Sequence, residues 1–173
     1  MTVNDSFHIY DTTLRDGAQQ EGLNLSVHDK LAIARHLDDL GVGFIEGGWP
    51  GANPKDTEFF KRAQTELQLK NATFVAFGAT RRPGVKAADD VLLRALQDSR
   101  AAAVTLVAKS HDRHVDLALK TNLDENLKMM NAWYKDANNI LNPHIAAIKE
   151  NGRAASNAVE ASLIFVDLNI DIS

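Results

Sequence analysis

The chain has 173 residues, of which 45% are hydrophobic and 24% are charged, and it contains no cysteine. This composition is typical of a globular protein, and it excludes disulfide frameworks, thiolate metal sites and cysteine nucleophiles. The net charge of −4 at pH 7 argues against nucleic acid as the main partner. No apolar run approaches the roughly 20 residues of a membrane span, and the N-terminus lacks a signal-peptide pattern. We therefore expect no membrane partner and a reducing, cytoplasmic location.

The first elements follow from hydrophobic patterning and helix-end signals. Residues 7–10 are a short apolar run that predicts a buried strand. Ser26 predicts the start of a helix as its N-cap, with Asp29 three residues later in an approximate capping box. Apolar residues continue at helical spacing until Gly41, which predicts the end of that helix. Residues 42–46 then predict a second strand.

The same alternation continues through the next sixty residues. A second helix is predicted over 56–67, a third strand over 72–77 with Gly78 interrupting it, and a third helix over 87–97. A fourth strand is predicted over 102–107. Strands alternating with helices predict βαβ units and a parallel sheet, and the near-continuous apolar strands are those expected when both faces are covered.

After about Lys128 the pattern changes. Residues 129–150 form a mixed helical stretch rich in asparagine and broken by Pro143. Residues 153–161 predict a short helix, and residues 163–172 have a strand-like pattern. We therefore divide the chain into a domain over 1–128 and a divergent, mainly helical tail over 129–173.

Polar and glycine residues cluster just after the carboxyl end of each predicted strand. These clusters are residues 11–20, 46–53, 78–82 and 109–114. In parallel α/β folds that edge of the sheet is where ligands bind. The sequence therefore predicts a small-molecule site built from all four clusters.

Arg15 and Asp16 are the first candidates for chemistry at this edge. The carboxylate can hold a divalent cation, while the guanidinium can grip a carboxylate or carbonyl oxygen of a substrate. The alternative is an arginine–aspartate ion pair that pins the loop. Charge pattern alone favours this alternative, because such pairs are common.

Four strings resemble a known family in the right order and spacing. They are DTTLRDGAQ at 11–19, FIEGGWPGANPKD at 44–56, VAFGATRRPG at 75–84 and VTLVAKSHDRHV at 104–115. They are similar to the metal-dependent TIM-barrel lyases and synthases that act on acyl-CoA and 2-oxo acids, and most similar to their citramalate synthase branch. The resemblance covers roughly residues 6–128. It implies that the α/β units form the first half of a TIM barrel.

The resemblance implies roles for several residues. Asp16 matches the metal-coordinating carboxylate, for Mg, Mn or Zn, and Arg15 matches the residue that stabilises the enolate or the keto-acid carbonyl oxygen. Glu46 is open between contacting substrate and orienting Arg15. Three further residues are implied as substrate contacts: Gln19, Arg81 and Lys109.

The implied reaction is a Claisen-type condensation of acetyl-CoA with pyruvate, or another 2-oxo acid, to a 2-hydroxy diacid in isoleucine or leucine biosynthesis. In the family a metal chelates the 2-oxo acid and the thioester is then hydrolysed. This sequence departs from that pattern, because it has no His-x-His pair to complete the metal site. Its tail also does not resemble the family continuation. Catalysis by this chain alone is therefore not expected, and binding of a metal should be weak.

Three explanations remain open for the departure. The chain is a truncated or frame-shifted product, a fragment that assembles with another chain, or a non-catalytic half-barrel interaction module. A half barrel leaves open strand edges and an apolar inner face. We therefore expect a homo-oligomer or a partner chain to cover them, unless the tail does so.

Overall fold

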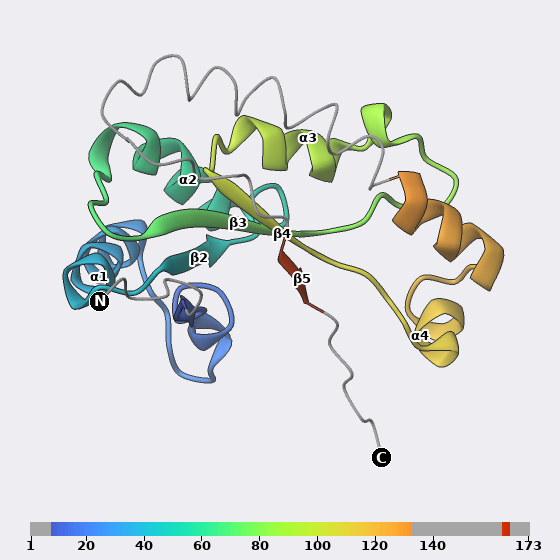
Figure 1. Ribbon diagram of the computed structural model, residues 1–173, viewed down its shortest axis with the longest axis horizontal. Helices are drawn as coiled ribbons and strands as arrows, with labels where there is room; N and C mark the ends of the chain where they lie inside the picture. Colours follow the sequence, from blue (N-terminus) through green and yellow to red (C-terminus); the bar gives the residue numbers. More distant parts are fainter. Residues whose placement is uncertain (1–7, 133–163, 167–173) are drawn as a thin grey trace, which may run out of the picture.

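A computed structural model gives the fold and describes residues 8–132 and 164–166 (Figure 1). One parallel sheet has its strands in chain order: β1 (Tyr10–Asp11), β2 (Phe44–Gly48), β3 (Thr73–Ala79), β4 (Ala103–Val107) and β5 (Ile164–Val166). The helices are α1 (Val27–Leu40), α2 (Pro54–Glu66), α3 (Val91–Asp98) and α4 (Asp112–Leu117), with 3-10 turns η1 (Gly17–Gln19) and η2 (Ala87–Asp89). Residues 123–132 are also helical. The predicted alternation of four parallel strands with three helices is confirmed.

The ends of α1 are those that the sequence predicts. The Ser26 side chain accepts a hydrogen bond from the backbone N–H of Asp29, and the Asp29 carboxylate accepts one from the backbone N–H of Ser26. Gly41 ends the helix at a φ of 86°, in the left-handed region that glycine favours. Local hydrogen bonding therefore sets both ends of this helix.

Several predicted boundaries need correction. β1 begins at Tyr10, because its ladder to β2 starts at the pair Tyr10 and Phe44; of the predicted strand 7–10, residue 7 lies outside the described residues. β2 runs past Glu46 to Gly48 through an irregularity in its register. Gly78 does not interrupt β3, because it pairs with Leu106 of β4.

The predicted helix over 87–97 is divided at Asp90. This residue is in extended conformation, and its carboxylate accepts hydrogen bonds from the N–H groups of Leu92 and Leu93. η2 therefore ends and α3 begins at an aspartate N-cap.

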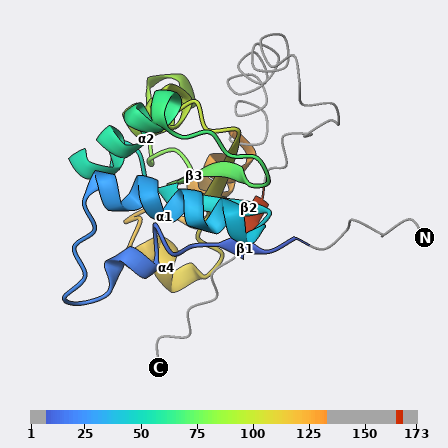
Figure 2. The ribbon, with the colours of Figure 1, turned by 90° about the vertical axis from the view of Figure 1, so that its left-hand side faces the viewer.

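One apolar core joins α1, α2 and α3 to one face of the sheet. It contains buried residues from each helix and from β2, β3 and β4: Leu31, Ala34, Ile45, Phe59, Phe60, Ala63, Ala76, Leu96, Val104 and Leu106. Figure 2 shows α1 and α2 lying side by side. Because side chains alternate along a strand, the neighbours of these strand residues, such as Glu46 and Thr105, face the other side.

The sheet curls toward that other side. The hydroxyl of Tyr10 on β1 contacts the hydroxyl of Thr105 on β4, three strands away. In a flat sheet those strands would lie about 14 Å apart, because neighbouring strands are spaced by about 4.8 Å. A tyrosine can bridge them only if the sheet is strongly curved, as it is in the wall of a barrel.

Part of the tail joins the sheet. Ile164–Val166 lies within the predicted strand-like stretch over 163–172 and pairs in parallel with Thr105–Val107 of β4. The predicted helix over 153–161 and most of the stretch over 129–150 lie outside the described residues, so the division at Lys128 stays a prediction. In the described part of the chain, no helix is long and apolar enough to cross a membrane.

Candidate functional site

Hydrogen bonds fix the loop after β1, in which Leu14 is buried in the core and the next residue, Arg15, lies outside it. Leu14 is fully buried and anchors the loop in the core. The backbone N–H groups of Arg15 and Gly17 both donate to the carbonyl of Thr12, each at 3.1 Å. Thr13 also donates to the Asp11 carboxylate through its backbone and its hydroxyl. Arg15 therefore starts from a well-defined backbone.

The Arg15 guanidinium is held by three neighbours. Its Nε donates to Glu46, the middle residue of β2, and its Nη1 lies 3.4 Å from an oxygen of Asp16. Its Cζ lies 4.1 Å from the centre of the Phe77 ring on β3. A cation over an aromatic face is attracted by the ring quadrupole. The structure thus brings side chains of β2 and β3 together around the arginine that follows β1.

Glu46 is buried, with 1% of its side chain exposed. One carboxylate oxygen accepts from Arg15, and the other accepts from the Tyr10 hydroxyl at 2.8 Å. A buried carboxylate needs such partners, because burial without them is costly. Of the two alternatives for Glu46, this geometry matches the one in which it orients Arg15.

Tyr10 and Thr105 belong to the same cluster, and sequence reasoning missed both. Burial is the largest cause that raises the pKa of the Tyr10 phenol well above its ordinary value, and the nearby Glu46 charge adds to it. Tyr10 therefore keeps its proton over the whole working pH range. The signal in the sequence was only a tyrosine at the end of an apolar run, which is also typical of a core residue.

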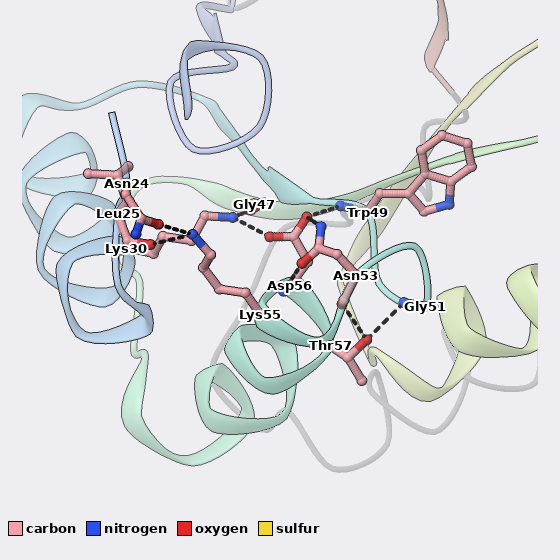
Figure 3. A network of polar contacts seen from close by, with 10 residues as sticks. All are labelled: Asn24, Leu25, Lys30, Gly47, Trp49, Gly51, Asn53, Lys55, Asp56 and Thr57. Carbon is pink, nitrogen blue, oxygen red and sulfur yellow. Dashed lines mark hydrogen bonds and ion pairs between the residues drawn. The ribbon is translucent and has the colours of Figure 1, made fainter. Parts of the chain in front are cut away.

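A second network of polar contacts, made by residues of α1 and α2, holds the loop after β2 (Figure 3). Lys30 of α1 is 3% exposed, and its Nζ donates to the Gly47 carbonyl at 2.9 Å and to the Asp56 carboxylate at 2.5 Å. Burial lowers the pKa of Lys30, although the Asp56 charge opposes that shift. The ion pair thus ties α1 and α2 to the residue directly after Glu46.

Asp56 also organises the turn itself. Its second oxygen accepts from the backbone N–H of Trp49 at 2.9 Å and from the Asn53 amide at 3.0 Å. Gly48 lies against this carboxylate with a φ of 144°, and a Cβ there would lie 2.6 Å from it. The Trp49 ring packs edge-on against Phe77 at 5.4 Å between centroids. The turn therefore places an aromatic side chain beside the ring that supports Arg15.

The other predicted site residues are placed differently. Asp16 has 65% of its side chain exposed, and Gln19 is exposed at the end of η1. Arg81 is almost buried, and it donates to Glu125 at 2.8 Å rather than into an open site. Lys109 is half-buried just after β4, and its backbone carbonyl accepts from the Asn126 amide. Thus only Arg15, Asp16 and Glu46 form one contact group among the predicted residues.

The described residues do not fit a complete metal site. Asp16 offers an exposed carboxylate, but the Glu46 carboxylate is already used by Arg15 and Tyr10. Among residues 8–132 and 164–166, no three acidic or histidine side chains are grouped to hold a metal ion. One carboxylate leaves most of a coordination sphere to water. The arrangement is better suited to binding a small anion at Arg15.

Comparisons with known proteins identify the family of this chain. The profile of the HMGL-like family matches residues 6–163. The chain is 70% identical over 128 residues to the (R)-citramalate synthase of Streptomyces coelicolor, a match covering 74% of this chain and 24% of the relative. It is 51% identical over 126 residues to the (R)-citramalate synthase of Aquifex aeolicus, covering 73% and 24%. It is 34% identical over 130 residues to the 2-isopropylmalate synthase of Bacillus licheniformis, covering 75% and 24%.

The chain therefore spans about a quarter of the length of these relatives. In three dimensions it is similar to the HMG-CoA lyase of Bacillus subtilis, with a TM-score of 0.57 and 18% identity over 76% of this chain and 42% of that one. That likeness concerns the fold. It identifies the curled parallel sheet as the first part of a TIM barrel, as the sequence predicts.

Proposed function

This chain belongs to the HMGL-like family, and from that premise we propose that it carries the first half of a citramalate-synthase-like acyltransferase site. In this proposal Arg15 binds the 2-oxo acid pyruvate. The methyl carbon of acetyl-CoA, after loss of a proton, would add to the ketone carbon of pyruvate, and hydrolysis of the thioester would release CoA and give a 2-hydroxy diacid in isoleucine or leucine biosynthesis. The observation that carries the proposal is the Arg15 guanidinium, in the loop after β1, held by Glu46 of β2 and Phe77 of β3.

The position of Arg15 suits it to a substrate's negative charge. Its Nε is used by Glu46 and its Nη1 makes a long contact of 3.4 Å with the exposed Asp16 carboxylate, so Nη2 and the second N–H of Nη1 are the donors for carboxylate or carbonyl oxygens. The aromatic support and the buried carboxylate hold the guanidinium in place before a ligand arrives. Donors that are already oriented stabilise developing charge without further reorganisation. Arg15 is therefore the residue that would stabilise an enolate or a keto oxygen.

The remaining predicted residues have secondary places in the proposal. Gln19, which is exposed at the end of η1, would contribute a substrate contact from the loop after β1. Arg81 would have to leave Glu125 before it could contact a substrate carboxylate or a CoA phosphate. Lys109 would contribute charge at the end of β4. Asp16 would contribute one ligand to a weakly held divalent ion.

A binding experiment tests the proposal directly. Titration of the purified chain with pyruvate, followed by calorimetry or NMR, should give weak saturable binding that Arg15→Gln abolishes. Arg62→Gln is the matched control, because Arg62 pairs with Glu66 on the exposed side of α2. Equal binding by the parent chain and Arg15→Gln would contradict the proposal.

An activity assay tests whether this chain alone catalyses the condensation. We expect little or no release of CoA from acetyl-CoA and pyruvate with Mn2+ or Mg2+, because the described residues do not make up a metal site. Robust turnover that depends on Arg15 would instead show that residues outside the described part supply the missing groups. The binding titration, and not this assay, decides whether Arg15 of this chain binds pyruvate.

We also propose that a second copy or a partner chain completes the barrel in a cytoplasmic assembly. In the part of the chain that the structure describes, β1 is an edge strand, paired on one side with β2. Edge strands present unpaired backbone groups that tend to recruit another strand. Light scattering should find a mass above the 19.0 kDa of one chain, and a monomer at micromolar concentration would contradict this part of the proposal.

A further inference from the structure

The Tyr10 hydroxyl links two strands that are not neighbours in the sheet. It donates to Glu46 on β2 at 2.8 Å and contacts the Thr105 hydroxyl on β4. Glu46 and Thr105 are buried, with relative exposures of 1% and 0%. Both contacts lie on the face of the sheet opposite the helices, and Tyr10 and Arg15 bind the two oxygens of the same Glu46 carboxylate.

The protons of this cluster can be assigned from chemistry. A phenol has one proton to donate, and the ionised Glu46 carboxylate can only accept. The Tyr10 proton must therefore point at Glu46, and Thr105 must donate its own proton to the Tyr10 oxygen. Because burial raises the pKa of the Tyr10 phenol, Tyr10 keeps this proton at alkaline pH.

We propose that Tyr10 is a positioning residue for Arg15, acting through Glu46. The Tyr10 hydroxyl holds one oxygen of the carboxylate and thereby aims the other at the Arg15 Nε. The guanidinium then has its Nε occupied and its plane set against Phe77. Insofar as it concerns substrate, this inference rests on the proposed binding of a 2-oxo acid at Arg15.

A purely structural role for Tyr10 makes a different prediction. The Tyr10 ring stacks on Phe44 at 5.9 Å between centroids, and a phenylalanine ring could do the same. Only the hydroxyl reaches Glu46 and Thr105. Tyr10→Phe therefore separates the packing role from the positioning role.

The experiment follows the Arg15 Nε–H signal in the NMR spectrum of the intact chain, identified by its loss in Arg15→Lys. In the parent chain we expect a signal that exchanges slowly with water, since its proton is bonded to a buried carboxylate. In Tyr10→Phe the exchange should accelerate on the order of tenfold, the effect of losing one hydrogen bond to a charged group. Pyruvate affinity should fall by a similar factor, whereas backbone amide signals of α2 and α3 stay in place.

Two further variants make the result decisive. Thr105→Val removes the donor to Tyr10 but not the bond to Glu46, so it should give a smaller change in the same direction; it also serves if Tyr10→Phe fails to fold. Thr73→Val is the control, a hydroxyl deletion on β3 that should leave the Arg15 signal unchanged.

The inference is overturned if folded Tyr10→Phe, or Thr105→Val in its place, keeps the parental Arg15 exchange rate. If the parent chain does not bind pyruvate, the proposed function fails, but the exchange rates still decide whether Tyr10 positions Arg15.

Discussion

The guanidinium of Arg15 lies over the ring of Phe77, with 4.1 Å between its carbon and the ring centroid. Trp49 meets the same ring edge-on. One phenylalanine on β3 is thus shared by the arginine that follows β1 and the tryptophan that follows β2. The proposed anion site therefore combines a side chain within β3 with residues of two different loops.

Removing Arg15 should destabilise the fold as well as the site. Arg15→Gln leaves the buried Glu46 carboxylate without its cation, and breaking such a pair costs about 3 kcal/mol. We expect urea denaturation to show a loss of that size. The neighbouring variant Asp16→Asn should leave the free energy of unfolding unchanged, since Asp16 is exposed. Adding Glu46→Gln to Arg15→Gln should recover part of this loss, because the unpaired buried carboxylate is then removed. Strictly additive losses in this double variant would contradict the pairing.

Stability should fall in acid partly through Asp38. Burial alone would raise the pKa of this carboxyl, but hydrogen bonds from the N–H groups of Lys70, Ala72 and Asn71 together hold it below 3.8. A lowered pKa in the folded state gives stability that is present above the unfolded pKa and is lost as pH falls through the folded value. Unfolding free energies of the parent and Asp38→Asn should therefore differ at pH 7, and the difference should shrink as pH falls below 3.8 towards the lower pKa of the folded state. A constant difference across that range would exclude this carboxylate as the source.

How much of the structure can be predicted from the sequence depends on how far apart in the chain the interacting residues lie. Ser26 and Asp29 are three residues apart, so their capping box is visible in the sequence and is confirmed. Asp90 gives the same kind of local signal as an N-cap, but the prediction of one helix over 87–97 passes over it and is wrong at that residue. The α/β order followed from the apolar runs, since these need only local periodicity.

The unpredicted parts of the site depend on long-range geometry. Tyr10 and Thr105 are 95 residues apart and meet because the sheet curls. Lys30 and Asp56 form a buried pair between two helices, although lysine and aspartate are usually exposed, and the sequence analysis assigned them no site role. Arg81 lies near the predicted edge, but its pairing with Glu125 depends on a helix that local patterning had not indicated there.

Gly48 should be intolerant of a side chain, unlike Gly41. Both have positive φ values, of 144° and 86°, but a Cβ at Gly48 would lie 2.6 Å from the Asp56 carboxylate, whereas nothing lies within 4 Å at Gly41. Gly41→Ala should cost about 1 kcal/mol for backbone conformation alone. Gly48→Ala should cost more than about 2 kcal/mol, because it also disturbs the Lys30–Asp56 pair. Thermal unfolding followed by circular dichroism measures the loss of stability in both variants. Equal losses would show that the Asp56 carboxylate moves aside at little energetic cost.

Divalent cations should bind the chain weakly, and through Asp16. This carboxylate is exposed, and its nearest charged neighbour is the Arg15 Nη1 at 3.4 Å, which repels a cation. With most of the coordination sphere left to water, the affinity should be low and sensitive to salt. Paramagnetic broadening by Mn2+ should therefore centre on residues near Asp16 and should weaken in Asp16→Asn, which keeps the fold because the side chain is exposed. Asp39→Asn, on the exposed side of α1, is the matched control for general charge effects. If Asp16→Asn and the parent chain broaden identically, Asp16 acts only as a partner of Arg15, and the metal role implied by the family does not extend to this chain.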